Sequence, residues 1–216
     1  MIFIDVIEIV FLFALFAASH TFLASRKIKN RITQNLGNKI AFYRLFYNIS
    51  SLLIFAAIYF IAPKPDMIVY DLQYPFDIIT FALQVLSLIG LIWAAKPIDM
   101  KEFAGISQIE RFIKGDYNIN DLDEKQELKI TGSFKLVRHP IYLFSILFLG
   151  LRPTMSLFYL VMFICLAAYF YIGSVYEERK LVEVFGHDYI NYQKSVPRLI
   201  PIKLKRKSKS ISQNVK

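Results

Sequence analysis

Long apolar runs separated by short charged segments dominate the chain. The first run, residues 2–23, carries only two charges, Asp5 and Glu8, and as a helix it is about long enough to cross a ~30 Å hydrocarbon core. Two further runs, 45–62 and 78–95, have a similar length. We therefore predict that each of these runs forms a membrane-embedded helix.

A helical hairpin is predicted next. Its apolar arms, 143–149 and 156–173, are joined by the turn-like Arg152-Pro153-Thr154. The segment 140–151 is short for a membrane crossing, so a shallow hairpin and a pair of crossings both stay open. In either arrangement the two ends of the hairpin return to the same side. The expected fold class is an all-α integral membrane bundle of about five helices.

A C-terminal amphipathic helix over 176–193 completes the predicted elements. Four large apolar residues recur there at helical spacing, with charged residues between them: Leu181, Phe185, Tyr189 and Tyr192. Such a stripe is typical of a helix that lies on a membrane or caps a bundle. We favour plain packing over ligand binding as its role. His187 lies off the stripe, so we expect it to face water and not to be catalytic.

The chain is interpreted as one membrane domain, 1–202, followed by a basic tail, 203–216. A polar connector over 98–135 precedes the hairpin. Pro197 and Pro201 disfavour helix in the residues before them and predict an extended segment ahead of the tail. We expect the tail to be disordered and cytoplasmic, where it contacts anionic lipid or anchors the topology.

Composition supports a membrane protein. Hydrophobic residues make up 56% of the 216 positions, whereas soluble domains average about 45–50%. The start lacks the basic region of a secretory signal, so we expect a retained anchor and not a cleaved leader. The single cysteine, Cys165, excludes an intramolecular disulfide framework. The sequence holds no P-loop, glycine-rich dinucleotide loop or metal-spaced His/Cys cluster, so no metal centre is predicted.

The distribution of charge predicts the orientation. The loop after the first run holds basic residues and no acid: Arg26, Lys27, Lys29, Arg31, Lys39 and Arg44. The next loop carries Asp66, Asp71 and Asp77. Because Lys and Arg concentrate on the cytoplasmic side, we expect the N-terminus outside and the C-terminus in the cytoplasm. The net charge of +9 then reflects topology, and it indicates a lipid bilayer as partner and not nucleic acid.

Ionisable residues flank the predicted hairpin. Residues 138–142, Arg-His-Pro-Ile-Tyr, open it, and Glu177-Glu178 close it. Charges beside apolar helices are costly and indicate a functional site. The first segment offers donors to a carboxylate or phosphate, and the second offers acceptors for a ribose, an amine or a cation. A zwitterionic ligand with a ribose would use all of them, while an ion-pair cluster that ties the hairpin ends together is an equally good interpretation.

Two segments carry a resemblance to a known family. The first is Thr131-Gly132-Ser133-Phe134-Lys135-Leu136-Val137-Arg138-His139-Pro140-Ile141-Tyr142. The second is Glu177-Glu178-Arg179-Lys180-Leu181, followed by Phe185-Gly186, Tyr189, Tyr192, Val196-Pro197 and Pro201. In this order and at this separation they resemble the signature of the membrane methyltransferases related to isoprenylcysteine carboxyl methyltransferase. The similarity covers 131–201.

Shorter matches indicate one branch of that superfamily. They are Ser19-His20 before the basic loop, then Asp99, Glu102-Phe103, Gly105 and Gln108, and Pro153-Thr154-Met155 in the hairpin turn. These segments are similar to the NnrU and methanethiol S-methyltransferase branch.

The resemblance implies an enzyme that uses S-adenosylmethionine as methyl donor, bound at the cytoplasmic ends of the last helices. By carry-over, the expected cofactor-binding residues are His139, Tyr142 and Glu178. The candidate catalytic residues are Arg138 and Glu177, which would shape the pocket, and His20. A thiol acceptor must form a thiolate, and His20 is a candidate proton acceptor for it. A histidine that is merely hydrogen-bonded at a helix end is an equally good interpretation of His20.

Two departures from the family pattern bear on the methyl acceptor. Phe144 stands where relatives often have Gly, which predicts crowding of the cofactor. Ser195 stands where the isoprenylcysteine enzymes tend to have a basic residue, leaving Lys194 and Arg198 as flanking cations. A prenylcysteine carboxylate would want a fixed cation beside it. We therefore expect a small or lipophilic acceptor that arrives from the bilayer or its interface, with a thiol favoured.

Other functions remain in competition with thiol methylation. They are a prenylcysteine carboxyl or phospholipid methyltransferase, a non-catalytic NnrU-like membrane accessory protein, and a sterol-type reductase using NADPH. The short chain disfavours the reductase. The accessory role stays open because a fold does not establish a function.

Overall fold

The computed structural model describes residues 1–119 and 128–202 of the chain. Its main helices are α1 (Ile2–Ala24), α2 (Arg26–Leu36), α3 (Tyr43–Ile61), α4 (Phe76–Ala95), α5 (Met100–Ala104), α6 (Ile106–Lys114), α7 (Pro140–Gly150), α8 (Leu157–Phe185) and α9 (His187–Ser195). Two 3₁₀ turns, η1 (Gly37–Phe42) and η2 (Gly132–Lys135), and two strands, β1 (Ile68–Asp71) and β2 (Thr154–Ser156), complete it. The predicted basic tail, 203–216, lies outside the described residues.

Four helical stretches are long and apolar enough to cross a membrane by length and composition: Ile2–Ala24, Arg26–Ile61, Phe76–Ala95 and Leu157–Phe185. The 11-residue α7 is shorter, at about 16 Å against a hydrocarbon core of about 30 Å. The predicted apolar runs therefore correspond to α1, α3, α4, α7 and α8. The chain is an all-α membrane bundle, as predicted.

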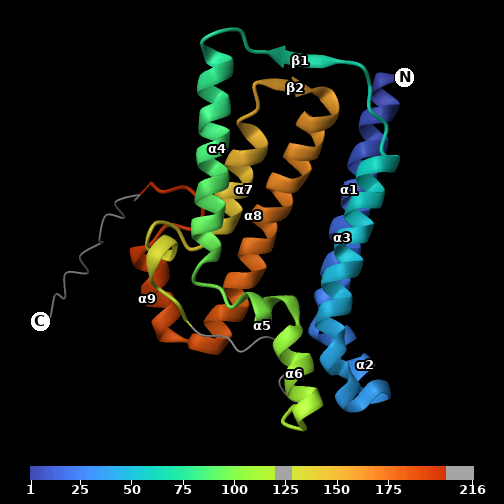
Figure 1. The fold of residues 1–216 in the computed structure, drawn as a ribbon, viewed down its shortest axis with the longest axis vertical. Helices are drawn as coiled ribbons and strands as arrows, with labels where there is room; N and C mark the ends of the chain where they lie inside the picture. Colours follow the sequence, from blue (N-terminus) through green and yellow to red (C-terminus); the bar gives the residue numbers. More distant parts are fainter. Residues whose placement is uncertain (120–127, 203–216) are drawn as a thin grey trace, which may run out of the picture.

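The long helices form two groups (Figure 1). On one side α1 lies beside α3, and on the other α4 packs along α7, with α8 between the groups and in contact with α1. The core between α1, α3 and α8 consists of Ile9, Phe13, Ile58, Ala62, Phe158, Val161, Met162 and Leu166. The two strands and the N-terminus lie at one end of the bundle, and α2, α5, α6 and α9 lie at the other.

The contact between α4 and α7 explains where the Phe144 ring packs. A Cβ atom added at Gly90 of α4 would lie 2.4 Å from the Phe144 ring, so the glycine leaves the space that this ring fills. Phe144 also makes an edge-to-face contact with Trp93, with 6.2 Å between centroids. The Phe144 ring therefore points at α4, and the expectation that it crowds a cofactor stays a prediction. Tyr142, two residues earlier, lies on the other face of α7 and contacts α8.

A small sheet covers the end of the bundle that carries the N-terminus. Strand β1 pairs antiparallel with β2, with Tyr70 opposite Met155 and Asp71 opposite Thr154. The Thr154 hydroxyl donates to Asp71 Oδ1 at 2.6 Å. We expected a loop and a turn here, because strands of four and three residues are too short to show an alternating pattern. The Pro153-Thr154-Met155 motif thus lies in and before β2, far along α8 from Glu177.

The C-terminal helices differ from the prediction. We expected the apolar helix to end at residue 173 and a separate helix to run over 176–193. Instead α8 continues for 29 residues to Phe185, because its last turns are rich in the good helix formers Glu, Arg and Lys. The break falls at Gly186, whose φ of +54° favours glycine. His187, which follows this break, is exposed, as predicted.

The predicted aromatic stripe spans the break and packs as a cluster. Tyr189, Tyr192 and Val196 are buried there, against partly buried Leu128, Leu181, Val182 and Phe185. Packing is therefore the role that the structure gives these residues. This cluster fixes α9 against the end of α8.

The polar connector contains a corner that packs on α3. The Asp99 side chain caps α5 by accepting from backbone N–H groups of its first turn at 2.9 and 3.1 Å. Glu102 forms two hydrogen bonds with Arg111 of α6, both 2.9 Å. Gly105 joins the two helices with φ +94°, and a Cβ there would lie 2.6 Å from the Leu45 backbone nitrogen. Asp99, Glu102 and Gly105 therefore hold α5 and α6 against the start of α3.

Candidate functional site

The site begins where the signature segment pairs with the extended C-terminal segment. The backbone N–H of Arg138 donates to the Pro197 carbonyl at 2.9 Å, and that of His139 donates to the Arg198 carbonyl at 3.1 Å. Pro140 then occupies the first turn of α7, where its missing N–H leaves no donor unsatisfied. The Arg-His-Pro order thus ends an extended segment and starts a helix within three residues.

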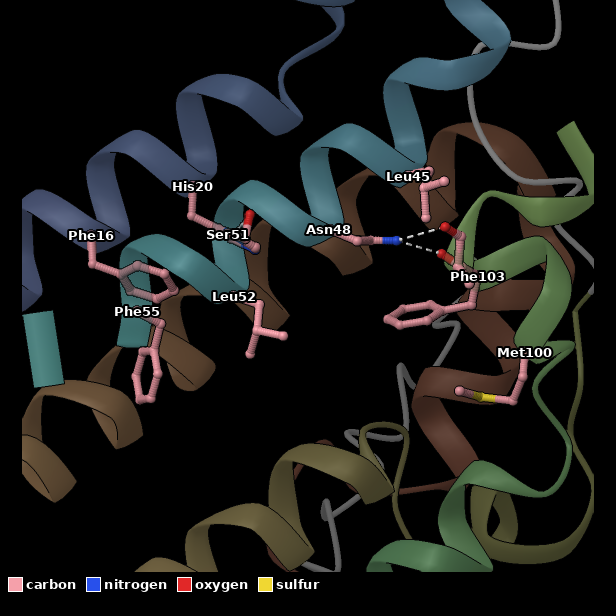
Figure 2. Close-up of a pocket in the computed structure, with 10 residues that line it drawn as sticks. Phe16, His20, Leu45, Asn48, Ser51, Leu52, Phe55, Met100 and Phe103 are labelled. Carbon is pink, nitrogen blue, oxygen red and sulfur yellow. Dashed lines mark hydrogen bonds between the residues drawn. The ribbon is translucent and has the colours of Figure 1, made fainter. Parts of the chain in front are cut away.

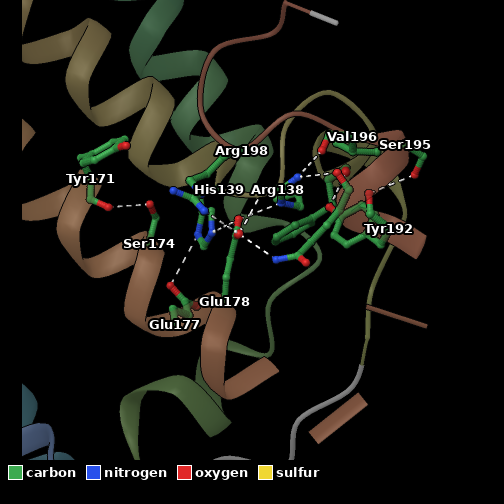
Figure 3. Close-up of polar contacts among 12 residues, drawn as sticks. Arg138, His139, Tyr171, Ser174, Glu177, Glu178, Tyr192, Ser195, Val196 and Arg198 are labelled. Carbon is green, nitrogen blue, oxygen red and sulfur yellow. Dashed lines mark hydrogen bonds and ion pairs between the residues drawn. The ribbon is translucent and has the colours of Figure 1, made fainter. Parts of the chain in front are cut away.

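Glu178 lies at the centre of the polar contacts in Figure 3. Arg138 binds its carboxylate through two hydrogen bonds, Nε to Oε1 at 2.7 Å and Nη2 to Oε2 at 3.0 Å. Gln193 and Arg198 donate to Oε2 at 2.9 and 3.1 Å. His139 Nε2 lies 3.2 Å from Oε1. The residue is 2% exposed, so its charge is compensated almost entirely by these donors.

The contacts of Glu178 join four parts of the chain. They connect α8 to the start of α7, to α9 and to the C-terminal segment. Arg138 extends the network, because its Nη1 donates to the backbone carbonyls of Gln193, at 2.9 Å, and of Val196. Arg138 and Glu178 therefore hold these four parts of the chain together.

Glu177 presents a more accessible carboxylate. Its side chain is 48% exposed, against 3% for its neighbour Glu178. The Tyr142 hydroxyl donates to Glu177 Oε2 at 3.0 Å, and His139 Nδ1 lies 3.5 Å from the same oxygen. The Tyr142 ring is stacked between His139, at 5.3 Å, and Phe170, at 5.1 Å. Glu177 is thus an acceptor beside the stacked rings of His139, Tyr142 and Phe170.

His139 has a carboxylate near each ring nitrogen. Burial lowers its pKa, but hydrogen bonds and charge attraction from Glu177 and Glu178 outweigh that effect, so the pKa is raised above its ordinary value. Both nitrogens donate only when the ring is protonated. The geometry therefore favours an imidazolium that bridges the two glutamates.

Five of the six predicted site residues come together, and His20 lies apart. In α1, His20 Nε2 is 2.6 Å from the Tyr47 hydroxyl, and Nδ1 is 2.9 Å from Ser51 Oγ. An aromatic contact links the two groups: Tyr169 makes an edge contact with His20 at 5.9 Å and neighbours Phe170, which stacks on Tyr142.

A cavity of about 480 Å³ borders His20; it is open to its surroundings, since the lining side chains of Leu52 and Met100 are 68% and 56% exposed. Figure 2 shows it between α1, α3 and α5. Asn48 fixes one wall, because its amide donates to the carbonyls of Phe103, at 2.9 Å, and Ala104, at 3.2 Å. The cavity shares no lining residue with the cluster around Glu178.

Sequence reasoning missed several members of both groups. Gln193 gave no signal, since it lies in a helix with many polar residues. Arg198 was considered only as a cation for an acceptor carboxylate, whereas it binds Glu178. Tyr47 and Ser51 were missed because they lie within the apolar run 45–62. Of the residues flanking the Val-Pro motif, Lys194 is exposed and Ser195 donates to a backbone carbonyl within α9 at 3.0 Å.

The donor set suits a zwitterionic ligand. The Arg198 Nε is buried and has no hydrogen-bond partner among residues 1–119 and 128–202, which leaves a donor for an anionic group. The half-exposed Glu177 offers an acceptor for a hydroxyl or an ammonium group. The stacked rings of His139, Tyr142 and Phe170 offer an apolar, polarisable surface to a planar or cationic group.

The fold is that of an all-α integral membrane protein, and the two segments that resemble the methyltransferase signature meet at one end of it. Comparison with curated proteins agrees. The chain is 30% identical over 195 residues to methanethiol S-methyltransferase 1 of Bradyrhizobium diazoefficiens, covering 88% of this chain and 65% of that protein. It is 28% identical over 193 residues to a methanethiol S-methyltransferase of Pseudomonas sp. (strain GM41(2012)), covering 88% and 71%. Over 68 residues it is 41% identical to that of Pseudomonas deceptionensis, covering 32% and 26%.

These similarities support the methanethiol S-methyltransferase-like branch of the membrane methyltransferases as the group that this chain resembles. The predicted resemblance is thereby confirmed. The chain spans 65% of the length of the Bradyrhizobium relative and 26% of the Pseudomonas deceptionensis relative in the matched regions. No protein-family profile and no solved structure matches it.

Proposed function

We propose that the protein is a membrane methyltransferase that uses S-adenosylmethionine and methylates a small or lipophilic thiol. One observation carries the proposal: the two signature segments, 35 residues apart at Tyr142 and Glu177, meet in a hydrogen bond of 3.0 Å. A homologue of methanethiol S-methyltransferases that assembles its signature residues into one site retains the framework for that chemistry.

The proposed cofactor contacts are His139, Tyr142 and Glu178. S-Adenosylmethionine supplies an electrophilic methyl group on a sulfonium sulfur. Tyr142 and His139 would provide the stacked surface, and the network around Glu178 would hold the ends of α7 and α8 in place. Glu177 would accept from a hydroxyl or ammonium group, and Arg198 would donate to a carboxylate.

The catalytic contribution of the chain is proposed to be positioning and proton removal. Methyl transfer depends mainly on alignment and on exclusion of water. Arg138 and Glu177 would fix the shape of the cofactor-binding part of the site. In thiol methylation a new sulfur–carbon bond forms as the sulfonium sulfur–carbon bond breaks, and the thiol proton remains to be accepted. His20 is the proposed acceptor of that proton.

We further propose that the site faces the cytoplasm. The basic loop after α1 supports this orientation, since it includes α2 and lies at the same end of the bundle as α9 and α5. The N-terminus would then be outside, together with β1 and β2.

A non-catalytic accessory role is favoured by one observation. Glu178 already accepts from four side chains, which is what an ion-pair cluster that only ties helices together would show. The two functions predict opposite results for cofactor binding. A carboxylate acceptor is disfavoured, because Arg198 binds Glu178 and its remaining donor is assigned to the carboxylate of the cofactor, while Lys194 is exposed.

The test is isothermal titration of the purified protein in detergent with S-adenosylmethionine and, separately, with NADPH. Binding of the first alone supports the proposal. Binding of NADPH alone would indicate a reductase. Binding of neither, by a protein that keeps its helical circular dichroism, would indicate the accessory role.

A further inference from the structure

We infer that the cavity between α1, α3 and α5 is the acceptor site, and that it takes a thiol with an apolar body larger than a single carbon. The inference rests on the proposed function, because it names where and how the acceptor of that reaction binds. Its support comes from the lining of the cavity, its volume and the hydrogen-bonded chain at His20.

The lining has an apolar body and one polar corner. Its apolar side chains are Phe16, Leu45, Leu52, Phe55, Met100 and Phe103. Asn48 also lines the cavity; its Nδ2 donates to two backbone carbonyls, while its Oδ1 can still accept. The polar groups that can meet a ligand are therefore His20, Ser51 and the Asn48 Oδ1 (Figure 2). A ligand that fits is apolar along most of its length and has one weakly acidic group.

The volume indicates a substituent of several carbons. The cavity holds about 480 Å³, within the range of roughly 300–1,000 Å³ that is usual for small-molecule sites. One water molecule occupies about 30 Å³ of the liquid, so a one-carbon thiol would leave most of the space unfilled. Unfilled apolar space forgoes packing contacts, which favours a longer alkyl or an aryl thiol.

The polar corner provides a route for the thiol proton. Ser51 is buried, and its Oγ lies 2.9 Å from His20 Nδ1. In the tautomer whose Nε2–H donates to the Tyr47 oxygen, across 2.6 Å, Nδ1 accepts from the Ser51 hydroxyl, and the proton route uses this tautomer. As the acceptor sulfur takes the methyl group, its proton passes to Ser51 Oγ and the serine proton passes to His20 Nδ1. The imidazolium so formed later returns its proton to water, which closes the balance.

Two aromatic residues of α8 connect His20 to the proposed cofactor-binding residues. Tyr169 makes an edge contact with His20. Its neighbour Phe170 stacks on Tyr142, whose hydroxyl binds Glu177. The thiol end of the cavity and the proposed cofactor residues thus lie on either side of one short stretch of α8.

The experiment measures apparent kcat/KM for ethanethiol and hexanethiol in one detergent and compares their ratio among variants. Each buried methylene is worth about fourfold in affinity. Partition into micelles also favours the longer thiol, but it does so equally for every variant. Leu52→Trp puts an indole on the wall of the cavity, and the control Leu53→Trp puts the same side chain on the neighbouring position, which is similarly exposed, 62% against 68%, but does not line the cavity.

We expect Leu52→Trp to lower the hexyl-to-ethyl ratio about tenfold or more, which corresponds to lost contact for about two methylenes. Leu53→Trp should leave the ratio at the parent value. Met100→Ala enlarges the cavity and should raise the preference for longer thiols. Binding of the product hexyl methyl sulfide, followed by thermal shift, should change in the same order. Equal ratios and equal sulfide binding in all these proteins would overturn the assignment of the cavity.

The proton route has its own readout. His20→Gln should retain binding of S-adenosylmethionine and of the sulfide, yet lose hexanethiol methylation at neutral pH. Thiophenol ionises at lower pH, so its methylation should be largely kept. Equal loss for both thiols would refute the proton route.

The outcomes also separate this inference from the proposed function. Failure of the parent to bind S-adenosylmethionine would refute the proposed function. Normal methylation of thiols with no effect of residues 52 and 100 would refute the cavity alone. A parent that binds the cofactor but methylates no thiol would refute both the thiol and its site.

Discussion

Replacing Glu178 by alanine should show whether its charge cluster is structural. The change removes the acceptor of Arg138, whose side chain is 8% exposed, and leaves it beside Arg198 without a counter-charge. Breaking a buried ion pair by removing one partner typically costs about 3–5 kcal/mol. Domain stabilities are typically about 5–15 kcal/mol, so this loss is a large fraction of the total.

The assay is a double-mutant cycle followed by thermal and chemical unfolding in detergent. Glu178→Ala and Arg138→Ala should each be strongly destabilising. The double variant should be less destabilised than their sum by about 2 kcal/mol or more, because the second change removes the charge that the first left unpaired. Glu177→Ala is the control: its side chain is 48% exposed, and its loss should cost at most about 1 kcal/mol.

Additive effects of Glu178→Ala and Arg138→Ala would refute this reasoning. So would a Glu178→Ala protein as stable as Glu177→Ala. A stable Glu178→Ala protein that no longer binds S-adenosylmethionine would instead assign the residue to the cofactor alone.

Further predictions concern the cofactor, pH, topology and one excluded histidine. Tyr142→Phe should lower affinity for S-adenosylmethionine about tenfold in titration, since a hydrogen bond to a charged group is worth roughly 1.5–3 kcal/mol; unchanged affinity would remove Tyr142 from the site. The raised pKa of His139 contributes stability that is fully present below its ordinary value of 6.5 and is lost as pH rises through the raised value. Relative to His139→Gln, the parent should therefore lose stability on the alkaline side, and parallel pH profiles would contradict the shift. Cysteine labelling of intact cells should reach position 71 but not position 202, and labelling of both would reverse the topology. His187→Gln should leave turnover unchanged, because His187 is exposed.

The sequence predicted the long helices well, because a membrane crossing needs about 20 apolar residues in a row. It misplaced the end of α8, since apolar periodicity stops near residue 173 while helix-forming polar residues continue to Phe185. The strands were missed because they are too short for a periodic signal. Each of these errors arises where the hydrophobic pattern stops carrying information.

The site was predicted in part for a similar reason. Arg138, His139 and the two glutamates could be found because charges beside apolar runs stand out. Tyr47 and Ser51 could not, since a single polar residue in an apolar helix looks like any other. The different environments of the two glutamates depend on tertiary contacts. Only the fold brings Gln193 and Arg198 to Glu178 and leaves Glu177 half exposed.

The central claim is that this protein transfers a methyl group to a thiol. The most direct test incubates purified protein with S-adenosylmethionine carrying a labelled methyl group, in the presence of an alkyl thiol and a prenylated cysteine side by side. We expect a labelled methyl thioether from the alkyl thiol. Label found only in a methyl ester of the prenylcysteine, or in neither acceptor while the cofactor binds, would contradict it.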